Sequence, residues 1–261
     1  MPALTATGPS FPLVDRYIGA RLGADLSAFG NEGVAVVESA RRLRREQSYG
    51  YIHALWWFWL TDGRSVASVP PGAGEAIDEV LREVRSAEQL SDPALVARLR
   101  PTVDVALLSA GLNATDRAQR ALWFACDAVH LRRHLCESCR RLTDESMPPA
   151  EGVRLPVHCF PDGIVYGAVA DGRVVSVAYA HRSGFMEDRV ADLGVETSPG
   201  CRRRGYARAM VSAVVEQVTH TGGEATYDCA PDNLASVATA RSVGFVPYGT
   251  SLALCAPAGA P

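Results

Sequence analysis

The amino-acid sequence predicts an α/β protein built on a mixed sheet of the α+β type. Two Asp-Gly pairs, at 62–63 and 171–172, each lie between two apolar runs, which is typical of the turns of β-hairpins. Residues 203–219 instead repeat apolar side chains every three or four positions, which predicts an amphipathic helix. A chain of 261 residues is long for one domain, and its patterning becomes more regular about half-way. We therefore expect an N-terminal mixed α/β domain over 1–138 and a second domain over 139–261.

Composition and charge describe an ordinary globular protein. Hydrophobic residues make up 48% of the chain and charged residues 21%, which is enough to build an apolar core. The formal net charge of -3 argues against a nucleic-acid partner, because nucleic-acid-binding domains are strongly basic. All 26 basic side chains are arginines, which excludes Schiff-base chemistry on lysine.

The sequence also bears on the compartment. The N-terminal residues lack the charged segment followed by an apolar core that marks a secretory signal. The longest apolar run, 54–60, is far too short to span a membrane, so no membrane partner is expected. Seven irregularly spaced cysteines suit a reducing compartment better than a disulfide framework. We expect the protein in the cytoplasm.

The N-terminal domain is expected to combine helices and strands. The Asp-Gly pair at 62–63 favours the positive φ values of a two-residue type I′ turn, so the apolar runs beside it are predicted to pair. Apolar spacings of three and four predict helices elsewhere. The predicted elements are a helix over 12–22, a strand over 33–38, hairpin strands over 51–60 and 64–69, and helices over 75–90 and 116–135.

The second domain is predicted in the order β-β-β-β-α-β-α-β. Its second and third strands form a hairpin on the Asp-Gly pair at 171–172. Gly222 and Gly223 are expected to end the first helix, as glycine often does just past a helix C-terminus. The predicted elements are strands over 140–143, 164–170, 173–181 and 189–197, a helix over 203–219, a strand over 225–229, a helix over 233–243 and a strand over 244–254.

The connection between the fourth strand and the first helix has features of an anion site. A helix that begins directly after a glycine-containing turn leaves its first N–H groups unpaired, at the positive end of the helix dipole. Gly205 removes a side chain where phosphates would approach the backbone. Positive charge is supplied nearby by Arg202, Arg203, Arg204 and Arg208. The alternative is a solvated basic helix start with a routine turn.

The surroundings of this turn resemble a known family. Arg202-x-x-Gly205-x-Ala207 matches the Arg/Gln-x-x-Gly-x-Gly/Ala signature of the GCN5-related N-acetyltransferase (GNAT) superfamily. The signature follows a strand that ends in Thr197-x-Pro199, a version of the family's Val-x-Pro. Later residues resemble the family's Asn-x-x-Ser and Gly-Phe segments, at Asn233, Ser236, Gly244 and Phe245. Order, spacing and context agree over residues 139–255.

The resemblance implies a GNAT-like fold whose sheet splays between two strands to admit acetyl-CoA. It implies that main-chain groups of the fourth strand pair with the pantetheine arm and that the turn cradles the pyrophosphate. Asn233 and Ser236 would hold the helix start and the pantetheine side, although Asn233 is equally well explained as an N-cap. The residues expected at the coenzyme are Val195, Glu196, Thr197, Arg202, Arg203, Arg204, Gly205, Tyr206, Ala207, Arg208, Asn233 and Ser236. No metal is expected.

The catalytic residues are less well defined. Many family members carry a tyrosine acid four residues before Gly-Phe, where this chain has Ala240. Tyr227, Cys229 or a water could substitute. The candidate bases are Glu196, His181 and Asp192, each of which has a structural alternative. Strand alternation places Asp192 and Glu196 on the face opposite Leu193, unless a β-bulge shifts the parity.

Two further patterns have more than one interpretation. His130, His134, Cys136 and Cys139 invite a zinc interpretation, but half-buried cysteines beside an arginine-rich helix surface are the favoured one. The repeated Asp-Gly-Arg hairpin segments are either unrelated or the trace of a degenerate second GNAT-like copy in residues 1–138. Because the connection after the first strand of the second domain is short, residues 1–138 are also expected to complete or cover the acceptor site. The Trp56-Trp57-Phe58-Trp59 run is then an acceptor wall or ordinary core.

Two classes of function follow. The first is an N-acetyltransferase that acts on a primary amine of a small molecule, such as an antibiotic or a metabolite, or on a protein N-terminus. The second is a catalytically quiet acyl-CoA-binding regulatory module. A homodimer formed through the final strand is a further expectation.

Overall fold

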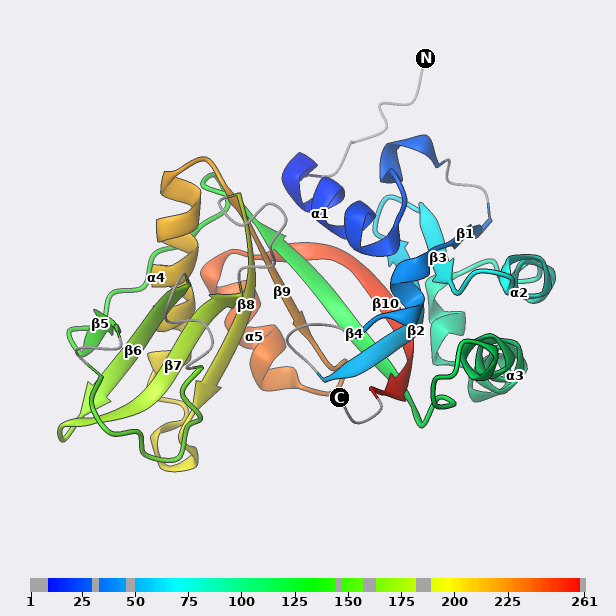
Figure 1. The fold of residues 1–261 in the computed structure, drawn as a ribbon. Coiled ribbons are helices and arrows are strands. Elements are labelled where there is room, and N and C mark those ends of the chain that lie inside the picture. The colour runs from blue at the N-terminus through cyan, green and yellow to red at the C-terminus, as the bar shows by residue number, and fades with distance from the viewer. Residues whose placement is uncertain are drawn as a thin grey trace, which may run out of the picture. The chain divides into compact units, whose positions relative to one another are not determined.

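The computed structural model describes residues 9–29, 33–45, 50–143, 147–156, 163–181 and 189–258 (Figure 1). By packing, the chain separates into two compact units. Unit 1 is formed mainly by Ile18–Trp123 and Tyr248–Pro261, and unit 2 by Phe11–Tyr17 and Phe124–Pro247. The predicted division at residue 138 marks a change in sequence pattern. The division by packing is different, because each unit contains segments from both halves of the chain.

Unit 1 is a sheet with two helices. The strand order is β1-β3-β2-β10-β4, with β1 and β3 parallel and β2 antiparallel to both β3 and β10. Short 3₁₀ turns at Leu26–Ala28, Ala40–Leu43 and Ala87–Ser91 lie between these elements. The strands are β1 (Ala35–Glu38), β2 (Tyr51–Leu60), β3 (Ser65–Val69), β4 (Arg117–Cys126) and β10 (Val246–Pro257), and the helices are α2 (Gly74–Leu81) and α3 (Pro93–Ser109).

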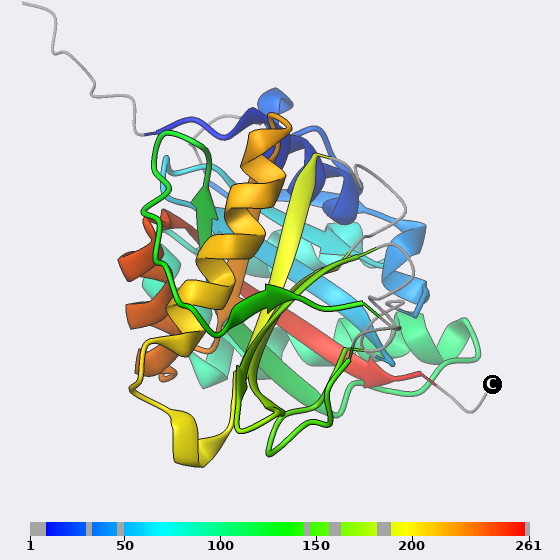
Figure 2. The same cartoon turned by 90° about the vertical axis from the view of Figure 1, so that its left-hand side faces the viewer.

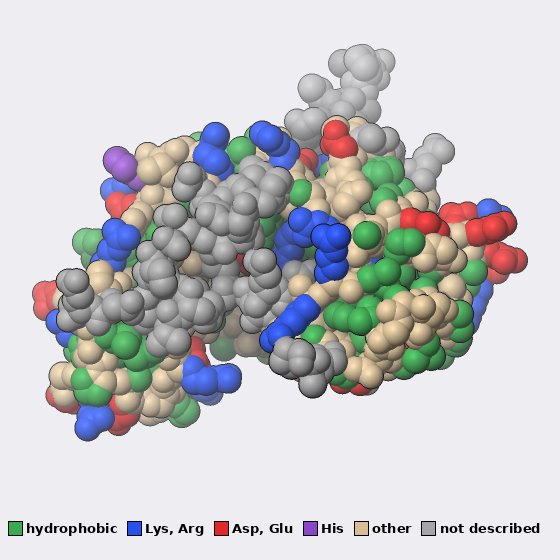
Figure 3. All heavy atoms as spheres, in the orientation of Figure 1, with side chains coloured by type: hydrophobic (Ala, Val, Ile, Leu, Met, Phe, Trp, Pro, Cys, Tyr) green, Lys and Arg blue, Asp and Glu red, His purple; other side chains and the backbone are tan. Residues whose placement is uncertain are grey.

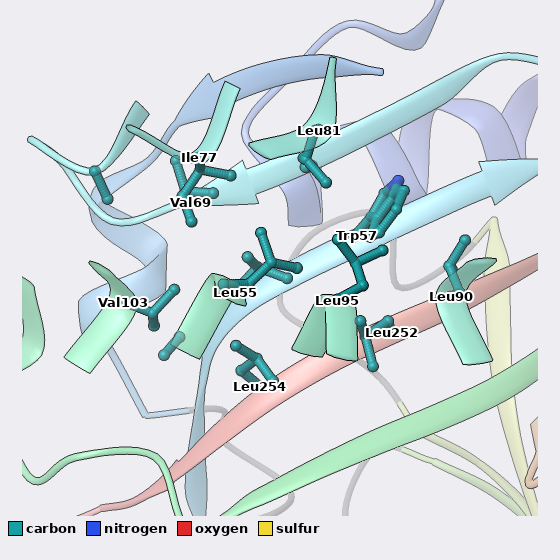
Figure 4. Packing of buried hydrophobic residues seen from close by; sticks show 14 of the residues in the cluster. Leu55, Trp57, Val69, Ile77, Leu81, Leu90, Leu95, Val103, Leu252 and Leu254 are labelled. Atoms are coloured by element: carbon teal, nitrogen blue, oxygen red, sulfur yellow. The ribbon is translucent and has the colours of Figure 1, made fainter. Parts of the chain in front are cut away.

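One face of this sheet packs against α2 and α3. Leu55 and Trp57 of β2 lie in one cluster with Leu252 of β10, and Ile77 and Val103 come from the helices (Figure 4). The Trp57 ring is fully buried and its Nε1–H donates to Ser65 Oγ at 2.8 Å. Hydrophobic burial of this kind is the main stabilising contribution to the unit.

The opposite side of β2 carries the alternate aromatic side chains. The Trp56 ring is 2% exposed and lies 5.8 Å from the Trp123 ring, and the Arg21 guanidinium lies 4.7 Å from the Trp56 ring centroid. Cation–π contact offsets part of the cost of burying this arginine. For Trp56 and Trp57 the interpretation as core is thus the one that the structure supports.

The prediction of a helix over 116–135 is wrong. Residues 117–126 form strand β4, and the chain from Asp127 onward turns without forming a helix. Trp123 Nε1–H donates to Ser251 Oγ at 2.9 Å, and Thr250 Oγ1 donates to the Ala121 carbonyl at 3.2 Å. A tertiary partner strand thus overrides a weak local helix preference.

Two other N-terminal predictions need correction, and one helix was not predicted. The helix over 75–90 stops at Leu81, because a capping box between Ser86 and Gln89 starts a separate 3₁₀ turn. Helix α3 was not predicted. The hairpin of β2 and β3 is present, but Gly63 has a φ of 95° while Asp62 is not in the positive-φ region. That turn is therefore not of type I′, which needs positive φ at both positions.

Unit 2 contains the other five strands of one ten-stranded sheet, and its predicted element order is confirmed up to the final strand. The strand order is β9-β8-β7-β6-β5, antiparallel except for the parallel pair β8 and β9. The turn at Asp171 and Gly172 has φ values of 50° and 74°, which confirms a type I′ turn. The elements are β5 (Cys139–Arg141), β6 (Ile164–Ala170), β7 (Arg173–His181), β8 (Val190–Thr197), α4 (Tyr206–His220), β9 (Glu224–Cys229) and α5 (Leu234–Val243).

The two faces of this sheet have different covers. Helix α4 lies across β6, β7 and β8 and contacts α5 (Figures 1 and 2). Tyr166 Oη donates to Gln217 of α4 at 3.1 Å, and Tyr166 pairs with Ala178, which pairs with Val195. Val195 therefore faces α4, and the neighbouring Glu196 faces the other way.

Helix α1 (Pro12–Leu22), which is the predicted N-terminal helix, begins on this other face. Phe11 and the first half of the helix, as far as Tyr17, belong to unit 2. The Val14 N–H donates to Glu224 Oε2 at 2.8 Å, and Tyr17 Oη donates to Asp192 Oδ2 at 3.1 Å. The start of the chain thus supplies a cover for the sheet face that carries Asp192 and Glu224.

The surface carries charged side chains of both signs (Figure 3). On the face drawn in Figure 3, arginine and acidic side chains are interspersed, in keeping with the net charge of -3. Over the ranges that the structure describes, none of the helices combines the length and the apolar character that a bilayer span requires.

Candidate functional site

The two parallel strands of unit 2 separate part-way along their length. β8 pairs with β9 from Val190 to Leu193, and the last paired residues are Leu193 and Tyr227. β8 continues to Thr197 while it pairs with β7 alone. Within the described part of unit 2, the edge of Gly194–Thr197 that faces β9 thus has no strand partner. The predicted splay is present, and it leaves main-chain donors and acceptors available to an extended ligand.

The turn after β8 presents the start of α4. A 3₁₀ turn covers Pro199–Cys201, and α4 begins at Tyr206, three residues later than predicted. Arg203 has a φ of 62° and Gly205 a φ of 85°, so left-handed residues flank Arg204. Alternation of this kind turns successive N–H groups toward one point, which makes an anion-binding concavity. A non-glycine residue held at positive φ is strained, and such strain concentrates at functional sites.

The N-terminus of α4 is open and basic. Its N-cap is Gly205, so no side chain caps the first turn. A Cβ added to Gly205 would lie 3.2 Å from Arg208 Nε, which shows that the Arg208 guanidinium lies over the turn. Arg202, Arg203, Arg204 and Arg208 are all exposed. These cations add to the positive end of the helix dipole.

The start of α5 lies beside the same strands. Asn233 Oδ1 accepts the Ser236 N–H at 3.1 Å, which confirms the interpretation of Asn233 as an N-cap. Burial raises the pKa of Tyr227 to about 12, against the opposing effect of its side-chain hydrogen bond with Ser236. The Tyr227 ring lies 5.7 Å from the Phe245 ring, and Ala240 is fully buried.

The two candidate carboxylates both have protein partners. Asp192 is 4% exposed; its Oδ2 accepts from Tyr17 Oη, and its Oδ1 accepts from Thr226 Oγ1 at 3.2 Å. Glu196 is half-buried, and its Oε2 accepts the Arg154 N–H at 3.0 Å. Both side chains thus have structural partners on the face opposite α4. No β-bulge lies between β7 and β8, where the register runs without a shift.

The third candidate base, His181, ends β7. Its main chain pairs with Asp192, and its side chain lies outside the described residues. Tyr179, two residues earlier on the same strand, was not predicted. It pairs with Gly194, and a Cβ on Gly194 would lie 2.3 Å from Tyr179 Cζ. A glycine inside a strand, which marks a close approach of another group, is the sequence signal that could have indicated this contact.

The histidines and cysteines at 130–139 do not gather around one point. His130 Nδ1 lies 2.7 Å from Asp127 Oδ1, and His134 Nε2 lies 2.9 Å from the Ser242 carbonyl. Burial, together with the neighbouring Cys136 thiol, raises the pKa of Cys139 to about 11. Throughout the portions of the chain with described coordinates, no three His, Cys, Asp or Glu side chains are placed to hold a metal ion. The zinc interpretation therefore has no support.

The residues that form this site lie in a segment that matches a known protein family. The family model described as acetyltransferase (GNAT) family matches residues 131–245, from the turn before β5 to the end of α5. Residues 131–245 thus match a model of acetyltransferases, the class of enzyme that the sequence predicts.

Solved structures of GNAT proteins resemble the chain at low identity. A GNAT-family protein from Novosphingobium aromaticivorans DSM 12444 is 19% identical over 55% of this chain and 67% of its own, with a TM-score of 0.46. An acetyltransferase from Colwellia psychrerythraea is 12% identical over 54% of this chain, which spans 58% of that protein, with a TM-score of 0.42. A tandem GNAT protein from the clavulanic acid biosynthesis pathway is 15% identical over 69% of this chain and 74% of its own, with a TM-score of 0.41. No curated protein matches the sequence.

Proposed function

We propose that the GNAT domain transfers an acetyl group from acetyl-CoA directly to a primary amine of a small molecule, an antibiotic or a metabolite. The observation that carries the proposal is the separation of β8 from β9 directly before the open N-terminus of α4. The unpaired strand edge is followed directly by the anion site. This order matches a ligand in which an amide-containing arm is joined to a pyrophosphate. No metal takes part in the proposed reaction.

This arrangement determines where each part of the coenzyme is proposed to bind. Main-chain groups of Val195, Glu196 and Thr197 pair with the pantetheine arm, since this edge of β8 lacks a strand partner. The pyrophosphate lies on the turn that runs from Arg202 to Arg208, against the first N–H groups of α4. Ser236 borders the arm, whereas Asn233 contributes by holding the first turn of α5.

The face opposite α4 is the proposed site of the amine. It carries the carboxylates of Asp192 and Glu196, which favour a cationic acceptor over an anionic one. Phe11–Tyr17 pack on this face, where Tyr17 Oη donates to Asp192. This supports the expectation that the N-terminal residues cover the acceptor site.

The reaction needs a neutral amine and a donor for the oxyanion. Glu196 or Asp192 takes the proton from the bound ammonium, directly or through water, and the amine nitrogen attacks the thioester carbonyl. A main-chain N–H of β8 near Val195 donates to the oxyanion, and one such preorganised donor contributes about 3 kcal/mol to transition-state stability. The acetyl group then moves to nitrogen as coenzyme A leaves.

Release of free thiol from acetyl-CoA tests the proposal. We expect thiol release to depend on added amine, within a panel of aminoglycosides, polyamines, amino sugars and peptides with free N-termini. Turnover with peptides alone would make the acceptor a protein N-terminus. Tight coenzyme binding in calorimetry without turnover on any amine would instead identify a quiet acyl-CoA-binding module.

A further inference from the structure

The splay between β8 and β9 narrows toward one end. The last pair of residues is Leu193 with Tyr227, and β8 runs on to Thr197 beyond this pairing. Paired strands lie about 4.8 Å apart, so an arm that takes a strand's place between β8 and β9 needs about twice that separation. The strands must therefore converge toward the pair of Leu193 and Tyr227. An extended group cannot continue between them past this pair.

The proposed path of the coenzyme brings its thioester to this narrow end. The turn that receives the pyrophosphate begins after Thr197. An arm that follows the edge of β8 away from the turn reaches Gly194 after about 10 Å, at about 3.3 Å per residue. The thioester thus lies beside Gly194, and the acyl carbons beyond it point toward Leu193 and Tyr227.

An aromatic side chain fills the α4 face of the narrow end. Tyr227 lies opposite Leu193, which shares the face of Val195, so the Tyr227 side chain also lies on the α4 face. Tyr227 is 2% exposed and its ring lies 5.7 Å from the Phe245 ring. Its hydroxyl hydrogen-bonds with the Ser236 side chain of α5, the helix that packs against β9 (Figure 1). These contacts hold the ring in place, so it does not swing aside for a larger group.

The opposite face of the same end is occupied by a second ring. Tyr179 of β7 pairs with Gly194, and a Cβ on Gly194 would lie 2.6 Å from Tyr179 Cε2. Tyr179 packs against an apolar cluster that includes Val165 and Val177. An acyl chain that starts beside Gly194 therefore meets an aromatic ring on each face and converging strands ahead.

We propose that Tyr227 is a specificity-determining residue whose ring limits the transferred acyl group to acetyl. This inference rests on the proposed function and names the residue that selects the acyl donor. An acetyl group places one methyl beyond the thioester carbonyl, whereas each longer acyl chain adds methylenes that press on the ring. A close-packed interior accepts added methylenes only by strain or displacement. The role depends on the ring and not on the hydroxyl.

The selection acts on transfer more than on coenzyme binding. A longer donor keeps the contacts of its pyrophosphate and arm, because these lie on the turn and along β8. Its acyl group, however, moves the carbonyl away from the main-chain donor of β8 and from the aligned amine, and small misplacements of reacting atoms lower the rate strongly. Longer acyl donors should therefore have a lower kcat/KM.

The experiment measures kcat/KM for acetyl-, propionyl- and butyryl-CoA, with the amine that turns over best. We expect wild type to prefer acetyl-CoA over butyryl-CoA by at least about tenfold. Y227A should reduce this preference to about threefold or less, because it removes the ring. Y227F keeps the ring and should keep the wild-type preference, whatever it does to the overall rate. The pair of variants thus separates the ring from the hydroxyl.

Y166A is the matched control. Tyr166 lies on the same α4 face but on β6, where its hydroxyl donates to Gln217, so the same truncation is made away from the splay. Its preference for acetyl-CoA should equal that of wild type. Y227L removes the far end of the ring and retains apolar volume, so it serves if Y227A has no cooperative thermal transition. It should reduce the preference in the same direction.

The outcomes distinguish the role of Tyr227 from the proposed function. Equal transfer of acetyl and butyryl groups by wild type, or a wild-type preference in Y227A or in its substitute Y227L, would overturn the role of Tyr227 and leave amine acetylation intact. A reduced preference in Y179A but not in Y227A would also overturn it, in favour of the ring on the other face. A wild type that transfers no acyl group to any amine would overturn both proposals.

Discussion

Both the backbone conformation at position 205 and the space available to a side chain there favour glycine. Its φ of 85° lies in the left-handed region, which costs an L-residue about 1–2 kcal/mol. A side chain would also press on the Arg208 guanidinium, which lies 3.2 Å from the position of a Cβ. Since Arg208 and the first N–H groups of α4 form the proposed pyrophosphate site, both effects act on coenzyme binding.

G205V should weaken coenzyme A binding at least tenfold, because a β-branched residue moves the turn out of its left-handed conformation. The measurement is the Kd for coenzyme A by calorimetry. The matched control is G200A in the same turn. Gly200 is not at positive φ, and nothing lies within 4 Å of a Cβ there. Equal affinities for wild type and G205V would refute the assignment of the turn.

At the scale of elements, α1 depends on a side chain distant in sequence. Glu224, the first residue of β9, is 7% exposed and accepts the Val14 N–H. Negative charge at a helix N-terminus interacts favourably with the helix dipole. Burial nevertheless raises the pKa of Glu224, and the N–H groups of Val14 and Leu13 only partly oppose this.

Stability should therefore depend on pH through Glu224. A folded pKa above the ordinary value of 4.5 means that the folded state keeps the proton where the unfolded state has lost it. The contribution to stability is greatest below this ordinary value and falls as pH rises through the folded pKa. Wild type should lose stability relative to E224Q as the pH rises above the ordinary pKa of 4.5 and through the raised folded pKa. Urea unfolding at several pH values measures this difference, and E216Q on α4 is the control. A constant difference across the range would contradict the prediction.

The elements also show what could be read from the sequence. β8, the turn and α4 were predictable because apolar periodicity and the motif at Arg202–Ala207 agree. That residues 117–126 form strand β4 was not predictable, because buried and exposed side chains do not alternate cleanly along it. The neighbouring residues Ala125 and Cys126 are both fully buried, a pattern that a buried helix could show equally well. The contact between Tyr179 and Gly194 depends on the register of β7 against β8, which no local pattern specifies.

For the whole molecule, the two units share chain segments at both ends. Phe11–Tyr17 pack in unit 2, although the rest of α1 belongs to unit 1. β10 continues from unit 2 into unit 1, where Leu252 pairs with Trp57 and is fully buried. The GNAT domain by sequence is therefore not a self-contained folding unit.

A fragment of residues 139–261 should fail to fold, in contrast to the full chain. It lacks Tyr17 and Val14, which bond to Asp192 and Glu224. It also leaves the apolar strand β10 without β2, and an unpaired apolar strand promotes aggregation. Dispersion of amide resonances and size-exclusion chromatography measure the result. A monomeric fragment with a cooperative thermal transition would show that the two segments are dispensable.

This sharing of segments also orders events during synthesis on the ribosome. Strands β1 to β3 emerge early, but the sheet they belong to is incomplete until β10 has left the exit tunnel. The first turns of α1 emerge earlier still and wait for β8 and β9. Neither unit can therefore close before its last strand has emerged, and both form from segments distant in sequence, which slows folding and prolongs exposure of apolar strands. A nascent chain of this design has particular need of chaperones that bind such strands.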